Sequence, residues 1–250
     1  MNWLFLFISF PLFSQSVFQN SIKNIIIDNK HISDIESVQG GDVAPIIYIN
    51  NPNFSNLPVS EKKIKFIDFI LPAILLEKDK IKKGYNYVLD HFDNTNINDT
   101  IQSLYDYCNC DNSYDLLLCL KEQPNSIIIA QAAIESGWGT SRFFLEGNNL
   151  FGIHTYNNDV NKLEANNSSL VYVKKYNNIS ESISHYLRTL AKGYAYANYR
   201  VNRLKDITSI ELIQELIMYS ERREFYVKDL KSIIDYNNLT IYDHLELKHD

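Results

Sequence analysis

The sequence of 250 residues has little glycine and proline, with 8 and 6 residues respectively. A collagen-like or low-complexity chain is therefore excluded. It also has no excess of positive charge, since 24 Lys and Arg face 30 Asp and Glu and the formal net charge is -6. Sequence-independent binding of nucleic acid draws on a cationic surface, so a nucleic-acid partner is not expected.

Cysteine is equally scarce, and the chain contains only Cys108, Cys110 and Cys119. In an oxidising compartment one pair could form a disulfide and leave the third thiol free, but the spacing does not decide which. A zinc site at Cys108 and Cys110 lacks a second pair of Cys or His ligands, so no metal is expected. The sequence also lacks an HExxH helix, a GxSxG elbow and a complete P-loop, which removes three common enzyme classes.

Long hydrophobic stretches are missing except at the N-terminus, where residues 1–13 are almost entirely apolar. This run is shorter than the roughly 20 apolar residues that a membrane-spanning helix needs. A small-x-small pattern follows at Ser14 to Ser16, so residues 1–16 are predicted to be a signal peptide. We therefore expect a periplasmic or secreted protein with no membrane span after processing. An uncleaved anchor or a buried N-terminal segment is the alternative interpretation.

What the chain does contain is a hydrophobic content of 45%, with 17 Tyr and 13 Phe. Residues 17–60 carry three of the prolines and short β-branched runs, and they are expected to form an extended leader or linker. After them, apolar residues recur at helical spacing, and a kink is expected at Pro72. This spacing predicts helices over 61–87, 84–92, 98–107, 113–120, 124–136, 140–147, 179–193, 208–219 and 223–236.

Residues 150–176 lose the helical period and are rich in asparagine. The alternating run from Leu170 to Val173 within them predicts a small β-hairpin. The fold class is therefore predicted to be α+β and mainly α, with a small β-hairpin insertion.

Glu135 is the one ionisable residue in the apolar helix predicted over 124–136, and it lies in the last turn. The carbonyl end of a helix carries a partial negative charge, which disfavours ionisation of a carboxyl group there. If Trp138 folds back over Glu135, desolvation acts in the same direction. A carboxyl group that stays protonated can serve as the general acid for a glycosidic oxygen. The alternative is a solvated carboxylate beside a core tryptophan.

The sequence around Glu135 reads AQAAIESGWGTSR, and EGNNLFG follows shortly after it. This stretch resembles the AQAA-x-ES-x-WG-x-S…GNN-x-FG signature of the glucosaminidase family of peptidoglycan hydrolases, also named for mannosyl-glycoprotein endo-β-N-acetylglucosaminidase. The segments FIDFILP, AYANYR and YSERREFYV further resemble the Bax-type subgroup of that family. The likeness covers about residues 62–238 and departs from the relatives at residues 153–155.

The resemblance implies a lysozyme-like catalytic domain, placed at 61–245, in which Glu135 is the catalytic acid. The implied activity is cleavage of β-1,4 bonds in peptidoglycan glycan strands, on the reducing side of N-acetylglucosamine. Neither a cofactor nor a metal is expected, and the protein is expected to be a monomer. A muramidase or a lytic transglycosylase of the same fold is the nearest alternative, because a fold does not settle which bond is cut. An inactive wall-binding protein is a further alternative.

The partner group of Glu135 is left open by the sequence. Asp159 and Glu164, in the predicted hairpin insertion, are the candidates for a second carboxylate. Tyr219 matches a tyrosine of the family motif and is the candidate for orienting an N-acetyl group in a substrate-assisted attack. The residues expected to contact substrate are Trp138, Asn148, Asn149, Phe151 and Arg142. Each has an alternative role. The asparagines could form a turn, Phe151 could lie in the core, and Arg142 could form an ion pair with Glu146.

Overall fold

The structure is a computed structural model, which describes residues 22–38, 41–91, 97–156, 159–164 and 171–248. The α-helices are α1 (Val59–Asp90), α2 (Asp99–Cys108), α3 (Ser113–Leu120), α4 (Asn125–Ser136), α5 (Arg142–Gly147), α6 (Ile179–Lys192), α7 (Ala197–Asn202), α8 (Ser209–Leu212) and α9 (Glu224–Tyr236). The 3-10 helices are η2 (Ile32–Asp34), η3 (Phe54–Asn56), η4 (Tyr194–Tyr196), η5 (Ile213–Leu216) and η6 (Leu239–His244). The strands are β1 (Ile25–Ile27), β2 (Ile46–Tyr48), β3 (His154–Thr155), β4 (Lys162–Glu164) and β5 (Tyr172–Lys174).

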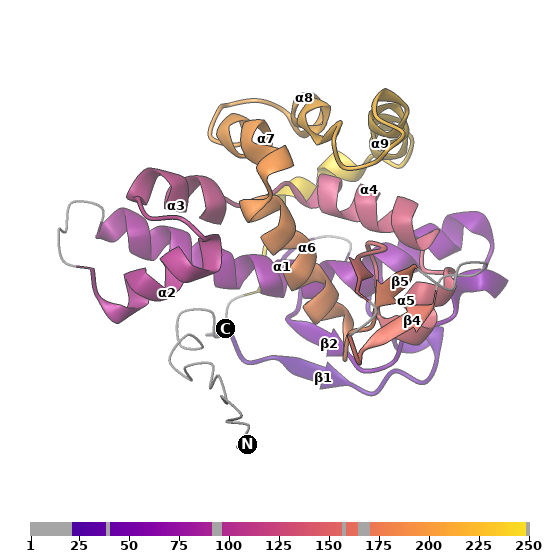
Figure 1. The fold of residues 1–250 in the computed structure, drawn as a ribbon. Coiled ribbons are helices and arrows are strands. Elements are labelled where there is room, and N and C mark those ends of the chain that lie inside the picture. The colour runs from indigo at the N-terminus through magenta and orange to yellow at the C-terminus, as the bar shows by residue number, and fades with distance from the viewer. Residues whose placement is uncertain (1–21, 39–40, 92–96, 157–158, 165–170, 249–250) are drawn as a thin grey trace, which may run out of the picture.

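Helix α1 runs through the middle of the molecule, with α7, α8 and α9 on one side and β1 and β2 on the other (Figure 1). The helices predicted over 61–87 and 84–92 are one continuous helix in the structure, and Pro72 lies inside it. Its central part, Phe66 to Lys78, is buried throughout, because α3, α4 and α6 pack against it. The predicted class, mainly α with a small β insertion, is confirmed.

Helix α4 is apolar around most of its circumference, which is the pattern of a helix covered on all sides. It starts after Pro124 and ends at Gly137, whose φ of 59° lies in the left-handed region that favours glycine. Both ends agree with the sequence prediction within one residue. The buried helix thereby holds its last turn, and Glu135 with it, in a fixed place.

The segment expected to be an extended leader is packed against the core in its described part, which corrects that expectation. Strands β1 and β2 form a small parallel sheet. Phe54, which has no exposed surface, packs against Phe66 and Phe144 at ring-centroid distances of 6.0 and 6.5 Å. The short β-branched runs do not show this in the sequence, because they lack a period and become buried only through contact with α1 and α5.

The insertion predicted as a hairpin is a three-stranded antiparallel sheet in the order β3-β5-β4. Val173 in the central strand pairs with His154 on one side and Leu163 on the other. The predicted strand at 170–173 is found as β5, shifted by two residues. The predicted helix at 208–219 is divided into α8 and η5, and α7 was not predicted.

Residues 1–16 lie outside the described part of the chain, so the predicted signal peptide stays a prediction. Within the described part, no helix combines the length and the apolar character needed to cross a bilayer.

A disulfide joins Cys108 at the end of α2 to Cys119 in α3, and Cys110 is the free cysteine. The bridge closes a loop with a sequence separation of 11 residues. The chain-entropy relation for a loop of this size gives about 3 kcal/mol of stabilisation through the unfolded state. We expect the double variant Cys108→Ser, Cys119→Ser to lose about that much free energy of unfolding in urea. Cys110→Ser serves as the control, and equal stability of the double variant and this control would contradict the expectation.

Candidate active site

Glu135 lies in the last turn of α4, and its side chain is half-buried. Its carboxylate oxygen Oε1 accepts a hydrogen bond of 3.1 Å from the hydroxyl group of Tyr226 on α9. Burial raises the pKa of Glu135 above its usual value, and the hydrogen bond from Tyr226 opposes part of that rise. The direction expected from the sequence therefore agrees with the structure, and burial is its main cause. A carboxyl group with a raised pKa can hold a proton and deliver it.

Trp138 follows the helix end in a left-handed conformation, with a φ of 57°. Its ring packs edge-on against Phe66 of α1 at 5.8 Å, and the ammonium group of Lys63 lies 5.1 Å from the ring centre. Lys63 also lies 4.8 Å from the ring of Tyr236, so it is held between two aromatic rings. Among the described residues the ring of Trp138 therefore contacts side chains of α1, whereas its backbone N–H donates to the carbonyl oxygen of Ala133 in α4. The expected cover over Glu135 is not among these contacts.

The tyrosine that touches Glu135 is Tyr226 and not Tyr219. The two rings stack at 5.4 Å, so Tyr219 supports the ring of Tyr226 from behind. Both residues lie in the YSERREFYV motif, and the sequence predicts a role for the first of them. Only their packing distinguishes them, because Tyr226 lies in α9 on the side that faces α4.

The two asparagines expected to contact substrate donate hydrogen bonds to backbone carbonyl oxygens of the protein. Asn149 is 1% exposed, and its amide nitrogen donates to the carbonyl oxygens of Ile153 at 2.9 Å and Lys174 at 2.8 Å. Asn148 ends α5 in a left-handed turn, accepts a hydrogen bond from Asn51 and donates one to the Tyr176 carbonyl. The turn that the sequence offered as the alternative is present at Asn148, and contact of the two asparagines with substrate stays a prediction.

Phe151 and Arg142 likewise act within the protein. Phe151 is 3% exposed and stacks on Tyr186 with a ring-centroid distance of 4.0 Å, so it is a core residue. Arg142 forms the ion pair with Glu146 that was the alternative to substrate contact, with an N–O distance of 3.2 Å, and also donates to the carbonyl oxygen of Glu164. Arg142 thus ties α5 to β4, and an exposed pair of this kind contributes little to stability.

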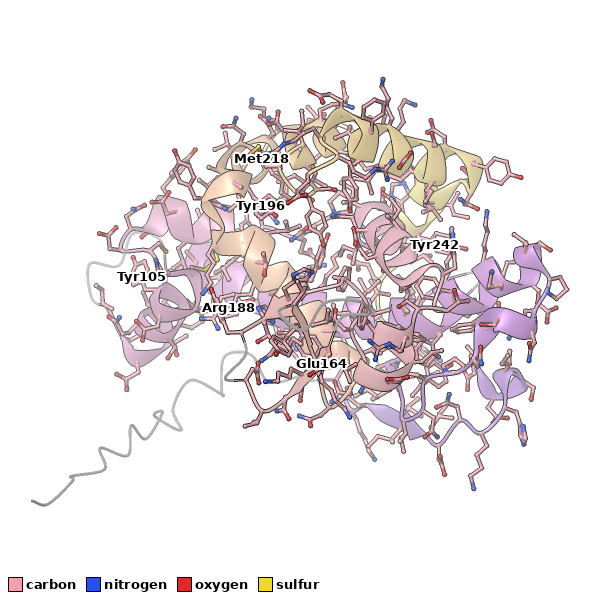
Figure 2. All side chains as sticks on the ribbon, turned by 45° about the vertical axis from the view of Figure 1, so that its right-hand side comes forward. Tyr105, Glu164, Arg188, Tyr196, Met218 and Tyr242 are labelled. Atoms are coloured by element: carbon pink, nitrogen blue, oxygen red, sulfur yellow. A yellow bond between two sulfur atoms is a disulfide. The ribbon has the colours of Figure 1, made fainter. Side chains whose placement is uncertain are left out.

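The two candidate second carboxylates have different surroundings. Asp159 accepts hydrogen bonds from Lys174 Nζ at 2.8 Å, Thr155 Oγ1 at 2.6 Å and the backbone N–H of Asn161 at 2.9 Å. The hydrogen bond from Lys174, followed by the other two, holds the pKa of Asp159 well below its usual range. Glu164, labelled in Figure 2, lies at the end of β4 with an exposed side chain. Asp159 is thus engaged in closing the sheet, whereas the carboxylate of Glu164 is open to solvent.

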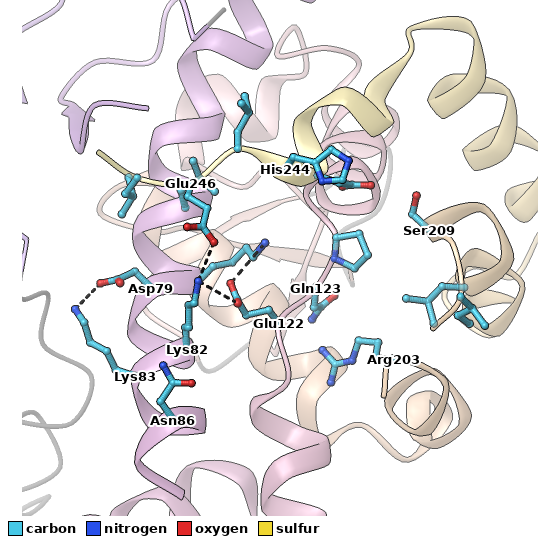
Figure 3. A pocket seen from close by; sticks show the side chains of 18 of the residues that line it. Asp79, Lys82, Lys83, Asn86, Glu122, Gln123, Arg203, Ser209, His244 and Glu246 are labelled. Atoms are coloured by element: carbon cyan, nitrogen blue, oxygen red, sulfur yellow. Dashed lines mark hydrogen bonds and ion pairs between the residues drawn. The ribbon is translucent and has the colours of Figure 1, made fainter. Parts of the chain in front are cut away.

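A separate cleft of about 690 Å³ lies at the opposite end of α4, between α1, α8 and the C-terminal segment (Figure 3). Several of its charged side chains pair with one another. Lys82 contacts Glu246 at 2.9 Å and Glu122 at 3.8 Å, and Lys83 pairs with Asp79. None of the site residues predicted from the sequence lines this cleft.

The fold and the half-buried carboxyl group at the end of α4 define the class as a mainly α domain with one candidate acid. Residues 118–239 match the model of the family described as Mannosyl-glycoprotein endo-beta-N-acetylglucosaminidase, the glucosaminidase family. The resemblance seen in the sequence is therefore confirmed.

Comparison with known proteins found a curated relative and a similar solved structure. The curated relative is Protein bax from Escherichia coli strain K12, which is 27% identical over 128 residues. That match covers 49% of this chain and 46% of the relative, so the chain spans about half the length of the curated relative it matches. A solved structure, the catalytic domain of the autolysin Auto from Listeria monocytogenes, has 24% identity and a TM-score of 0.40. It covers 65% of this chain and 87% of that one.

Proposed function

We propose that this protein is an exported peptidoglycan hydrolase that cuts β-1,4 bonds on the reducing side of N-acetylglucosamine, with Glu135 as the general acid. The observation that carries the proposal is the carboxyl group of Glu135, whose pKa burial raises and whose Oε1 accepts a hydrogen bond from Tyr226. The family match over residues 118–239 includes both residues and supports the same reaction class. Peptidoglycan glycan strands are the proposed substrate, and a monomer acting after removal of residues 1–16 is the proposed form.

In this mechanism the protonated carboxyl group of Glu135 donates its proton to the glycosidic oxygen as the bond to the anomeric carbon breaks. The leaving sugar departs as an alcohol, and the positive charge that develops at the anomeric carbon is neutralised by attack from water or from the substrate's own N-acetyl group. A base that takes the proton from water would complete an inverting reaction. The burial that raises the pKa of Glu135 favours the protonated form of the carboxyl group, from which the proton is delivered.

Glu164 is the better candidate for this base, because Asp159 is already paired with Lys174. We expect Glu164→Gln to lower the rate of hydrolysis by about 100-fold or more, which is the range for a general base. Asp159→Asn should stay within about tenfold of the parent rate, since its carboxylate has no free role. Release of soluble muropeptides at equal folded concentration measures both rates. A carboxylate base would be contradicted if both variants keep the full rate of hydrolysis and the rate falls only in a variant that blocks assistance by the substrate's N-acetyl group.

The function itself is tested by mass spectrometry of purified sacculi after digestion. Products with N-acetylglucosamine at the reducing end support the proposed bond specificity. Products with muramic acid at that end identify a muramidase, and anhydro-muropeptides identify a lytic transglycosylase. If the folded protein binds sacculi but releases no product, it is a wall-binding protein and the proposal is wrong.

A further inference from the structure

A chain of hydrogen bonds leads from Glu135 into the core between α4, α6 and α9. The hydroxyl group of Tyr186 donates to Gln131 Oε1 at 2.6 Å, and Gln131 Nε2 donates to the hydroxyl oxygen of Tyr226 at 3.1 Å. Tyr226 in turn donates to Glu135 Oε1 at 3.1 Å. Gln131 has no exposed surface and lies one helical turn before Glu135 on α4.

The direction of every bond in this chain follows from the carboxylate at its end. An ionised carboxylate can only accept, so Tyr226 must give its single proton to Glu135. The oxygen of Tyr226 is then left to accept, and Gln131 must present its amide nitrogen to it. The amide oxygen of Gln131 consequently faces Tyr186, which has to donate.

Raised pKa values favour the neutral form of both tyrosines, in which each has one proton to donate. Burial, reinforced by the negative charge of Glu135, raises the pKa of Tyr226 far above its usual value. Burial also raises the pKa of Tyr186 well above its usual value. Tyr219 stacks on Tyr226, and burial raises its pKa well above the usual value as well. Tyr196, Tyr199 and the guanidinium group of Arg203 are the further titratable groups that interact with Tyr186.

We propose that Gln131 and Tyr186 are positioning residues which, acting through Tyr226, reserve Glu135 Oε1 as an acceptor and so confine the catalytic proton to Oε2. This inference rests on the proposed role of Glu135 as the general acid. If the proton moved to Oε1, Tyr226 would have to turn its own proton away from Glu135. The amide nitrogen of Gln131 already points at Tyr226 on the other side, so no acceptor is offered there.

The surroundings of Glu135 Oε2 are consistent with a proton that stays on this oxygen. Oε2 faces the backbone of Gly152, where an added side-chain carbon would lie 3.6 Å away. Gly152 has a φ of 63°, a conformation that other residues adopt with strain. The stack of Phe151 on Tyr186, with ring planes 10° apart, holds the inner end of the hydrogen-bond chain still. Oε1 therefore faces a rigid donor, and a small residue keeps space beside Oε2.

The first test reads the proton position without using activity. The infrared difference spectrum between the protein and Glu135→Gln, recorded at a pH low enough to protonate Glu135, isolates the C=O stretch of that carboxyl group. In the parent protein we expect one band at the low frequency of a C=O that accepts a hydrogen bond. Gln131→Met should give two bands, because the proton can then occupy either oxygen, and Tyr226→Phe should give one band at higher frequency. Tyr219→Phe is the matched control and should leave the band unchanged.

The second test is the pH profile of hydrolysis, together with a carbon-13 NMR titration of Glu135. The hydrogen bond from Tyr226 favours the charged carboxylate, so Tyr226→Phe should raise the pKa of Glu135 by about one unit. The alkaline limb of the activity profile should move up by the same amount. Gln131→Met should lower kcat about threefold or more even where Glu135 is fully protonated, with KM unchanged.

Each result supports or overturns the proposal. A single unshifted band in Gln131→Met, with kcat equal to that of the parent, would show that Tyr226 alone sets the proton position. An equal shift in Tyr219→Phe would show that ring packing, and not the hydrogen bond, is responsible. Gln131→Met removes a buried amide, so Tyr186→Phe serves as a milder second variant. An unchanged band in both variants would overturn the proposed role of the hydrogen-bond chain. If the infrared bands are as expected but no hydrolysis is detected, the positioning role of Gln131 and Tyr186 is supported and the proposed hydrolase function is wrong.

Discussion

Replacing Glu135 by glutamine is expected to abolish the release of soluble muropeptides while the protein stays folded. The amide has nearly the same shape and can still accept the hydrogen bond from Tyr226 Oη, but it has no acidic proton to deliver. Loss of a general acid costs about 100- to 10,000-fold in rate, which makes this the largest effect on activity that we predict. The measurement is the initial rate of muropeptide release at equal folded concentration.

The matched control for this experiment is Glu61→Gln, which makes the same chemical change at an exposed position in the first turn of α1. It should keep the parent rate. If Glu135→Gln retains more than about a tenth of the activity, the residue has contributed less than about 1.4 kcal/mol to the transition state. Such a result would exclude Glu135 as the general acid.

The largest loss of stability is expected from Phe54→Ala, in the segment that precedes α1. Phe54 is fully buried among the rings of Phe66, Phe69 and Phe144. Removing a phenyl ring from such a cluster leaves a cavity and costs about 3–5 kcal/mol. We expect the free energy of unfolding, measured by urea titration, to fall by that amount.

Phe225→Ala is the control, because this ring is 66% exposed and its loss should change stability by less than about 0.5 kcal/mol. The comparison decides whether residues before α1 belong to the folding unit, although they precede the part matched by the glucosaminidase family. If Phe54→Ala unfolds at the same urea concentration as the control, the segment would act as the detachable linker that its composition predicted.

The sequence by itself determined the helices whose apolar residues and capping residues agree, above all α4 and its end at Gly137. It also determined Glu135 as the candidate acid, because one ionisable side chain in an apolar helix and the motif around it are both local features. These features depend on interactions within one or two helical turns. Such interactions are fixed by neighbouring residues, so a pattern in the sequence is enough to predict them.

Only the tertiary structure decided which side chains meet Glu135. Tyr226 is 91 positions away from it, and the choice between Tyr226 and Tyr219 depends on how α9 packs on α4. The same holds for Asn149, whose amide group closes the backbone through Lys174, 25 positions away. A buried polar group takes whichever partner the fold brings within hydrogen-bond distance, and that partner is set by the packing of distant segments.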